Sequence, residues 1–373
     1  MLSPTHRQIL RAISSSGPIT RSDVGTQLGL SKAAMSGLSR ELIDQGLIEE
    51  ASSIQRQGRP AVLLDVHPNG AYFIGVSMLS TPAPMALIDF KGRIVARATV
   101  ELAAEPDVFA QRISDAVPVL LGTVSKQRLA GIGVALSGLV DQDQATCIKS
   151  TLLGWQDVPL AALIQKRVAL PTFVENDAKA LALSEKHFGD AREFSTFTVI
   201  SLGGGIGSAH FIHNRLHRGA HGGAGEIAHT TIEPQGRPCR CGKVGCLDTI
   251  ASISAILEAA REAGLTAGTL HELEQAATGG SSAAIRILHR AGAALGLAIA
   301  NIIQINDPQM ILITHREKSF SGLFATVMQQ AIQTNVLPRL SGRTPIRTQR
   351  LDDDVWARGA ASVVADSFLH GLI

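Results

Sequence analysis

The sequence has little cysteine, since it contains only four in 373 residues. Three of them lie inside the segment PCRCGKVGCLD, residues 238–248, where they span eight positions. The N-terminus, MLSPTHRQIL, carries no hydrophobic export segment. Both absences predict a cytoplasmic protein in a reducing compartment. There, a cysteine cluster favours a metal site over a disulfide framework.

Long apolar runs are also lacking. The best candidate, residues 291–300, has about half of the roughly 20 residues that span a bilayer, and Arg290 and Asn301 bound it. We therefore expect a buried helix there and no membrane partner. With 45% hydrophobic and 18% charged residues, the composition is that of a globular protein of two or three domains.

A large excess of either charge is missing, since 34 Lys and Arg face 32 Asp and Glu. The small excess is local. Residues 1–60 carry seven cations against five acids, whereas residues 61–373 carry 27 of each. The location of this excess hints at a nucleic-acid partner for the N-terminal segment.

That segment predicts three short helices followed by a hairpin. Thr5 and Gln8 have the spacing of a capping box for the first helix, and Thr20 and Ser31 are the expected N-caps of the second and third. Two short helices joined by a tight turn predict a helix-turn-helix. The alternative is an ordinary small helical bundle.

The third helix, SKAAMSGLSRELIDQG, turns a small, polar face outward, which suits a DNA major groove. Ser39 is expected on this face as well. The two runs LIEEAS and AVLLDV then form a wing whose arginines suit a narrow minor groove, although a solvated hairpin would look similar. The predicted contacts to double-stranded DNA are Ser31, Lys32, Ala33, Ser36, Gly37, Arg40, Arg56, Gly58 and Arg59.

From residue 67 onward, strands mix with helices in the manner of an α/β fold with two similar lobes. A helix is expected over 106–128, and the final helix from about Asp354. We expect a winged helix over 1–66, a first lobe over 67–190 completed by the helix 354–373, and a second lobe over 191–353 that contains the dimer interface.

The cysteine cluster has a companion in His229, ten residues before Cys239. Together with Cys241 and Cys246 these residues supply three thiolates and one imidazole, the ligand set of a closed tetrahedral zinc site. Closed sites of this kind are usually structural, so we expect one structural Zn²⁺, with Cys147 uninvolved.

The same region, GAGEIAHTTIEPQGRPCRCGKVGCLDTIAS, resembles the signature of the ROK family (repressors, open reading frames and sugar kinases). The resemblance extends to LGGGIGSAHFIHNRLHRG, VENDAKALAL and IIQINDPQMILI, and so covers nearly all of residues 70–365. It implies a two-lobed actin- and hexokinase-like (ribonuclease H-like) domain. Family members with an N-terminal winged helix are typically transcription regulators of sugar metabolism. For this chain we expect a homodimer or homotetramer.

The resemblance also implies a sugar site at Asn176, Asp177, Glu226, His229 and Asp248. Carboxylates accept hydrogen bonds from vicinal hydroxyls, and a zinc-bound histidine donates through its other ring nitrogen. Two positions depart from the family pattern, since Asp248 stands in place of Glu and Ala228 in place of Gly. Asn176 and Asp177 also lie where a helix begins, so an N-cap is the alternative role.

The family's kinases hold ATP with an Asp-x-Gly-Gly-Thr loop and a later Gly-Gly pair. Here Ser77 replaces the aspartate, Leu79 and Ser80 replace the glycines, and Thr314-His315 replaces the later pair. Only the glycine-rich stretch GGGIG, residues 203–207, is intact. The expectation is therefore a sugar-responsive DNA-binding regulator, with a repressor favoured and no enzymatic activity. An ATP-dependent sugar kinase is the alternative, and a scaffold with an inactive pocket is disfavoured by the retained polar set.

Overall fold

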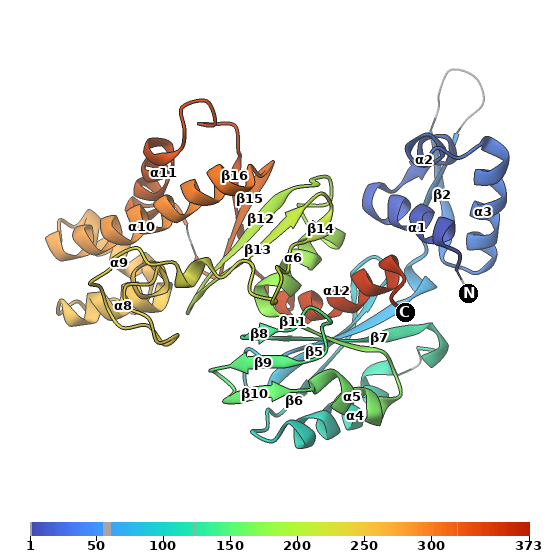
Figure 1. Ribbon diagram of the computed structural model, residues 1–373, viewed down its shortest axis with the longest axis horizontal. Helices are drawn as coiled ribbons and strands as arrows, with labels where there is room; N and C mark the ends of the chain where they lie inside the picture. Colours follow the sequence, from blue (N-terminus) through green and yellow to red (C-terminus); the bar gives the residue numbers. More distant parts are fainter. Residues whose placement is uncertain (1, 55–60, 123, 319) are drawn as a thin grey trace. The chain divides into compact units, whose positions relative to one another are not determined.

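The computed structural model describes residues 2–54, 61–122, 124–318 and 320–373. The chain divides into two compact units: Met1–Glu193 with Asp354–Ile373, and Phe194–Asp353. Each unit contains one five-stranded sheet, and the N-terminal helices belong to the first unit (Figure 1).

The winged helix consists of three helices and a small sheet in the order β1-β3-β2. Its elements are α1 (Pro4–Ser16), β1 (Ile19–Thr20), α2 (Arg21–Leu28), α3 (Lys32–Asp44), β2 (Ile48–Ile54) and β3 (Ala61–Val66). Thr20 caps α2 and Ser31 caps α3, which confirms both predicted N-caps. The short strand β1 is an addition to the expected wing.

The expected start of α1 was wrong by two residues. Ser3, not Thr5, is the N-cap, and it exchanges hydrogen bonds with His6 in a capping box. The physical reason is Pro4, which occupies the first helical position, where its fixed φ suits the helix and its missing N–H costs nothing.

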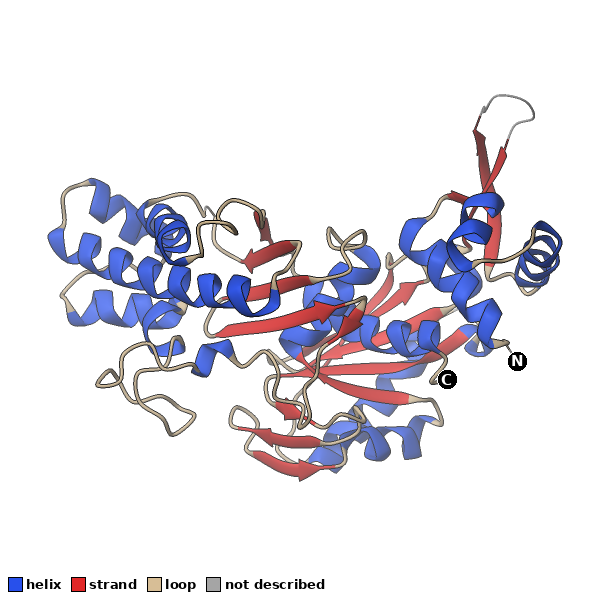
Figure 2. Cartoon of the chain, turned by 45° about the horizontal axis from the view of Figure 1, so that its top comes forward, coloured by secondary structure: helices blue, strands red, loops and turns tan. Residues whose placement is uncertain are grey.

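The first lobe is built on a five-stranded sheet in the order β11-β7-β4-β5-β6, with helices on both faces (Figure 2). The strands are β4 (Tyr72–Ser77), β5 (Ala83–Asp89), β6 (Ile94–Val100), β7 (Leu129–Leu136) and β11 (Thr172–Asn176). The helices are α4 (Pro106–Leu121), α5 (Leu160–Val168), α6 (Asp177–Phe188) and α12 (Val355–His370). A small sheet of β8 (Leu139–Val140), β9 (Cys147–Ser150) and β10 (Trp155–Val158) accompanies them.

Alternating residues of β4 explain the two covered faces. Ile74 packs in the cluster that contains residues of α4 and α5, whereas Phe73 packs in the cluster that contains residues of α12. Gly75 and Gly133 let α12 approach the sheet closely, because a Cβ at either position would lie 1.9 Å from a carbonyl oxygen of that helix. The predicted helix over 106–128 ends earlier, at Leu121, because Gly122 has a positive φ and a separate turn, Lys126–Arg128, follows.

The second unit contains a sheet in the order β14-β13-β12-β15-β16. Its strands are β12 (Phe197–Leu202), β13 (Ile206–Ile212), β14 (Arg215–Leu216), β15 (Met310–His315) and β16 (Ile346–Arg350). Its helices are α7 (Asp248–Ala251), α8 (Ile253–Glu262), α9 (Leu270–Thr278), α10 (Ser282–Asn306) and α11 (Leu323–Asn335).

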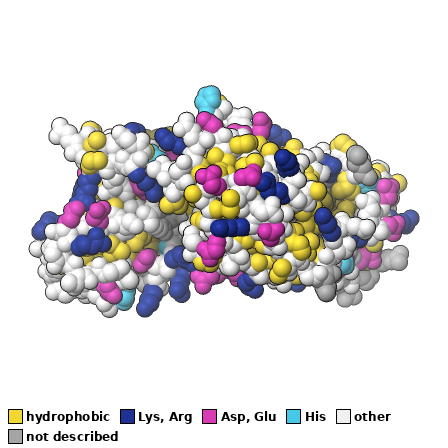
Figure 3. Space-filling view, turned by 90° about the horizontal axis from the view of Figure 1, so that it is seen from below, with side chains coloured by type: hydrophobic (Ala, Val, Ile, Leu, Met, Phe, Trp, Pro, Cys, Tyr) yellow, Lys and Arg dark blue, Asp and Glu magenta, His cyan; other side chains and the backbone are white. Residues whose placement is uncertain are grey.

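Helix α10 has the length and apolar composition of a membrane span, but 56% of its apolar window is buried in the unit. Gly292 and Gly296 bring it against α11, where a Cβ would lie 2.6 and 2.5 Å from backbone oxygens of that helix. This confirms the buried helix expected at residues 291–300. On the face shown in Figure 3, positive and negative side chains are interspersed.

Candidate functional site

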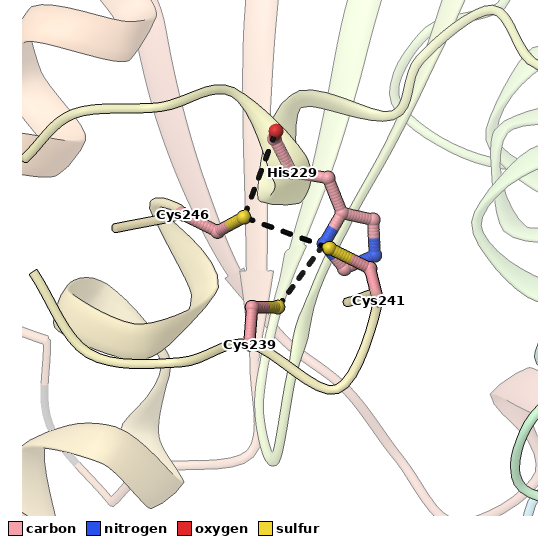
Figure 4. Close-up of side chains that lie close together, drawn as sticks. All are labelled: His229, Cys239, Cys241 and Cys246. Atoms are coloured by element: carbon pink, nitrogen blue, oxygen red, sulfur yellow. Dashed lines mark hydrogen bonds between the residues drawn. The ribbon is translucent and has the colours of Figure 1, made fainter. Parts of the chain in front are cut away.

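His229, Cys239, Cys241 and Cys246 converge on one point in the second unit (Figure 4). One ligand atom from each residue lies within 4.8 Å of all the others. The Sγ atoms of Cys241 and Cys246 are 3.7 Å apart, and Cys239 Sγ is 3.6 Å from His229 Nδ1. The residues that the sequence singled out as a metal set are therefore brought together.

These distances fit a tetrahedral zinc ion. Bonds of about 2.3 Å to sulfur and about 2.0 Å to nitrogen separate two sulfurs by about 3.8 Å and a sulfur from a nitrogen by about 3.5 Å. Burial and the two neighbouring sulfurs raise the pKa of the Cys246 thiol to about 12. A cation between the four residues would stabilise the thiolate forms, so this cluster could hold a metal ion.

The backbone of the loop is shaped for this convergence. Gly245 has a φ of 71° and passes so close to Glu233 that a Cβ would lie 1.5 Å from its carbonyl oxygen. Lys243 Nζ donates to the carbonyl oxygen of His229 at 2.8 Å, and the Cys239 amide donates to the carbonyl of Lys243. The loop is thus preformed around the four ligands.

His229 divides its two ring nitrogens between different neighbours. Nδ1 faces the sulfurs, whereas Nε2 lies 3.9 Å from a carboxylate oxygen of Glu226. The turn Ile227–His229 holds these side chains three residues apart, and Glu226 is exposed. Two of the five expected sugar contacts are therefore neighbours, and one of them belongs to the metal set as well.

Asp248, the third expected sugar contact of this unit, is already engaged. Its Oδ1 accepts a hydrogen bond from the Ile206 amide at 2.9 Å, and its Oδ2 lies 3.5 Å from Arg240 Nη2. The carboxylate therefore fixes the glycine-rich turn between β12 and β13. Arg240 was missed in the sequence, although a cation between two metal-ligating cysteines was the available signal.

Asn176 and Asp177 lie in the first unit, at the junction of β11 and α6. Asn176 Oδ1 accepts from the amides of Ala178 and Lys179, and its Nδ2 donates to the Gly138 carbonyl at 3.1 Å. The capping role that the sequence left open is thus present. Both side chains are half-buried.

The third helix of the winged helix presents the expected polar surface. Six of the predicted DNA contacts are exposed on or beside α3, namely Ser31, Lys32, Ala33, Ser36, Gly37 and Arg40. Ser39 is a correction, because it is fully buried and its Oγ accepts from Arg21 Nε at 3.1 Å. Arg56, Gly58 and Arg59 lie outside the described residues.

Two side-chain contacts between elements orient this helix and were not anticipated. Arg21 reaches from α2 to Glu50 on β2 at 2.6 Å while it holds Ser39. Glu41 of α3 lies 3.1 Å from His6 of α1. Acidic side chains beside the recognition surface are therefore paired within the winged helix.

The positions that replace the kinase phosphate loops are filled with side chains. Ser77 ends β4 and is fully buried. Thr314 is also fully buried and donates to the Ile200 carbonyl. His315 stacks on Phe320 with ring centroids 4.9 Å apart, and burial lowers the pKa of its imidazole. Thr314 and His315 therefore carry side chains where the later glycine pair of the kinases exposes backbone, and Ser77 offers no carboxylate to a metal.

The chain is similar to curated transcriptional regulators over nearly its whole length. The xylose repressor of Caldicellulosiruptor bescii is 27% identical over 97% of this chain and 95% of its own length. The transcriptional dual regulator NagC of Escherichia coli is 26% identical over 98% and 93%.

Two solved structures are similar along most of their lengths. A ROK family transcriptional regulator, described as a homologue of the E. coli MLC protein, has a TM-score of 0.79, 27% identity, and coverage of 99% of this chain and 96% of its own. A ROK family glucokinase from Streptomyces griseus has a TM-score of 0.64, 25% identity, and coverage of 79% and 99%. The expected two-lobed α/β fold, of the actin and hexokinase type, is confirmed.

Family models match both parts of the sequence. The model of the ROK family matches residues 73–367, and that of the MarR family matches residues 2–58. The chain therefore belongs to the ROK family, with a MarR-type winged helix preceding its ROK domain.

Proposed function

We propose that this protein is a sugar-responsive transcriptional repressor that binds double-stranded DNA through its winged helix. The observation that carries this proposal is the recognition helix α3, which presents Lys32, Arg40 and small residues to solvent in the same chain as a ROK domain. The names of the relatives support it, because both curated relatives described above are transcriptional regulators, one of them a xylose repressor.

On the DNA side, Lys32 and Arg40 supply the described cations of the interface, and Ser31, Ala33, Ser36 and Gly37 allow close approach to the groove. Arg56, Gly58 and Arg59 are proposed to enter the flanking minor groove. The working form is a homodimer or homotetramer in the cytoplasm, with the second lobe, residues 191–353, as the interface between copies. Two recognition helices then meet two half-sites of one operator.

The proposal is tested by binding to DNA from the region upstream of the protein's own gene, measured by fluorescence anisotropy over a range of salt concentrations. We expect nanomolar affinity that falls steeply with salt. Each phosphate that the protein neutralises releases a counterion, which adds about one unit to the slope of the logarithm of the binding constant against the logarithm of the salt concentration. Arg40→Ala should weaken binding about tenfold. Lys166→Ala, which removes an exposed cation of α5 in the first lobe, is the control and should leave affinity unchanged. Absence of binding at low salt would refute the DNA-binding role.

On the ligand side, Asn176, Asp177, Glu226, His229 and Asp248 are proposed to bind a sugar or sugar derivative through its hydroxyl groups. Glu226 and the Nε2 of His229 offer adjacent hydrogen-bonding groups. A structural Zn²⁺ held by His229 Nδ1 and the three cysteines would fix the orientation of that imidazole. Sugar binding changes the affinity for DNA by linkage.

We propose further that the protein lacks sugar kinase activity. Phosphoryl transfer depends on positioning ATP and its metal, and the buried Ser77, Thr314 and stacked His315 replace the groups that the related kinases use for this purpose. A coupled assay for ADP release with magnesium ATP, run with D-xylose, D-glucose and N-acetyl-D-glucosamine, should show no sugar-dependent turnover. Turnover that disappears in Asp177→Ala would establish the kinase alternative.

A further inference from the structure

The winged helix and the first lobe share one hydrophobic core. Ile9, Leu10 and Ile13 of α1 belong to the same buried cluster as Phe73 of β4 and Leu369 of α12. Within the lobe's part of this cluster, Phe73, Phe90 and Phe368 pack edge to face with ring centroids 5.7–5.9 Å apart. The DNA-binding part therefore packs directly against the first lobe and is not joined to it by the chain alone.

Three cations of the first unit, all outside the winged helix, lie at the edge of this core and bond to the winged helix. Arg128 Nη1 donates to the carbonyl of Gln45, the C-cap residue of α3, at 2.9 Å. Arg192 Nη2 donates to the carbonyl of Ser14, in the last turn of α1, at 2.8 Å. Each arginine thus satisfies a carbonyl at a helix C-terminus, where positive charge is favourable.

The third cation is Lys91, in the turn between β5 and β6. Its Nζ lies 2.9 Å from Asp65 on β3 and 3.3 Å from Glu49 on β2. Although burial alone would lower it, these two acids raise the pKa of Lys91. The wing strands, like the two helices, are thereby bonded to residues of the first unit that lie outside the winged helix.

Arg192 differs from the other two cations because its backbone is fixed to the end of α6. The amides of Gly189, Asp190 and Ala191 all bond to Glu185, and Lys186 Nζ donates to the Arg192 carbonyl at 3.0 Å. The turn is tight enough that a Cβ on Gly189 would lie 2.0 Å from the Glu185 carboxylate. Movement of α6 therefore carries Arg192 with it.

The other end of α6 begins with the residues proposed to bind sugar. Asn176 caps the helix and Asp177 is its first residue. The helix α6, 12 residues long, thus connects the proposed ligand contacts at its N-terminus to the turn that carries Arg192, which bonds to α1. His187 Nε2 also lies 2.9 Å from Asp366 Oδ1, which ties α6 to α12 beneath the same core.

We propose that Arg192 is a positioning residue that couples the sugar-binding end of α6 to the recognition helix through α1. The inference rests on the proposed function and names how its two sites communicate. A change at Asn176 and Asp177 displaces α6, the turn that follows it, and the Ser14 end of α1. Since α1 lies in one core with α3, the presentation of α3 to DNA changes with it.

The test compares Arg192→Ala with Arg112→Ala in the full chain. Arg112 is the matched control, because it also donates to two backbone carbonyls, Glu101 and Leu102, but both belong to the lobe. Amide hydrogen exchange in the last turn of α1 should accelerate at least about fivefold in Arg192→Ala and remain unchanged in Arg112→Ala. Equal exchange in both variants would overturn the structural half of the inference.

The second readout is the change in DNA affinity on adding D-xylose, D-glucose or N-acetyl-D-glucosamine. In Arg192→Ala this change should shrink at least about threefold while sugar affinity, measured by calorimetry, stays as in the unaltered chain. Arg192→Lys, which keeps the positive charge, should restore part of the sugar-induced change in DNA affinity. A full response in Arg192→Ala would overturn the coupling role. If the unaltered chain itself shows no response to any of these sugars, the coupling is refuted for them, and the exchange result still decides the docking role.

Discussion

Purified protein is expected to contain one zinc ion per chain, and Cys241→Ser is expected to lose it. Removing one of four ligands opens a closed tetrahedral site, and structural zinc contributes its binding energy to folding. The free energy of unfolding should fall by at least about 3 kcal/mol, because the loop between Glu226 and Asp248 loses the ion that fastens it. Elemental analysis and thermal unfolding measure the two effects.

Cys147→Ala is the matched control for this experiment. Cys147 is buried in the first lobe, where desolvation and Asp157 raise the pKa of its thiol to about 11. The variant should keep its zinc and lose only the packing of one small side chain, about 1 kcal/mol. Metal-free preparations of the unaltered chain with full stability would show that the four residues form no zinc site.

Asp177→Asn is expected to lower sugar affinity by about 100-fold or more, because the carboxylate that we propose as an acceptor for sugar hydroxyls is replaced by an amide, which accepts at one atom only. The fold should survive, since Asp177 stands half-buried at the first position of α6 and Asn176 supplies the cap. The measurement is the rise in melting temperature on adding D-xylose, D-glucose or N-acetyl-D-glucosamine.

Asp143→Asn makes the same change of charge at an exposed position of the same unit. Its sugar-induced thermal shift should equal that of the unaltered chain, and both variants should retain zinc. A normal shift in Asp177→Asn would place the sugar contacts at other residues. DNA affinity without sugar should be little changed in either variant.

Local signals explain which parts of this structure could be predicted. Thr20 and Ser31 were found as N-caps because capping depends on a few adjacent residues, and the metal set was found because its cysteines lie close in sequence. Ser39 was misplaced because helical periodicity alone does not reveal that Arg21, 18 residues earlier, holds its hydroxyl inside. The helix α1 begins two residues before the expected start, because Pro4 fits the first helical position and Ser3 then supplies the cap.

The docking contacts could not be predicted for a related reason. Arg128 and Arg192 bond to backbone carbonyls, 83 and 178 residues away in the sequence. A carbonyl is present at every residue, so no residue type marks the acceptor. Contacts of this kind become visible only when the tertiary structure has placed a helix end beside the arginine.

The position of α12 has a consequence for protein synthesis. Its residues complete the core beneath α1 and cover the sheet of the first lobe, yet they follow residues 194–353 in the chain. A nascent chain that has emerged only as far as β16 still lacks α12. It therefore exposes the apolar faces of β4 and α1, and its winged helix lacks the helix against which α1 packs. Operator binding therefore awaits the last helix, and prematurely terminated products are expected to be substrates for proteolysis rather than partial repressors.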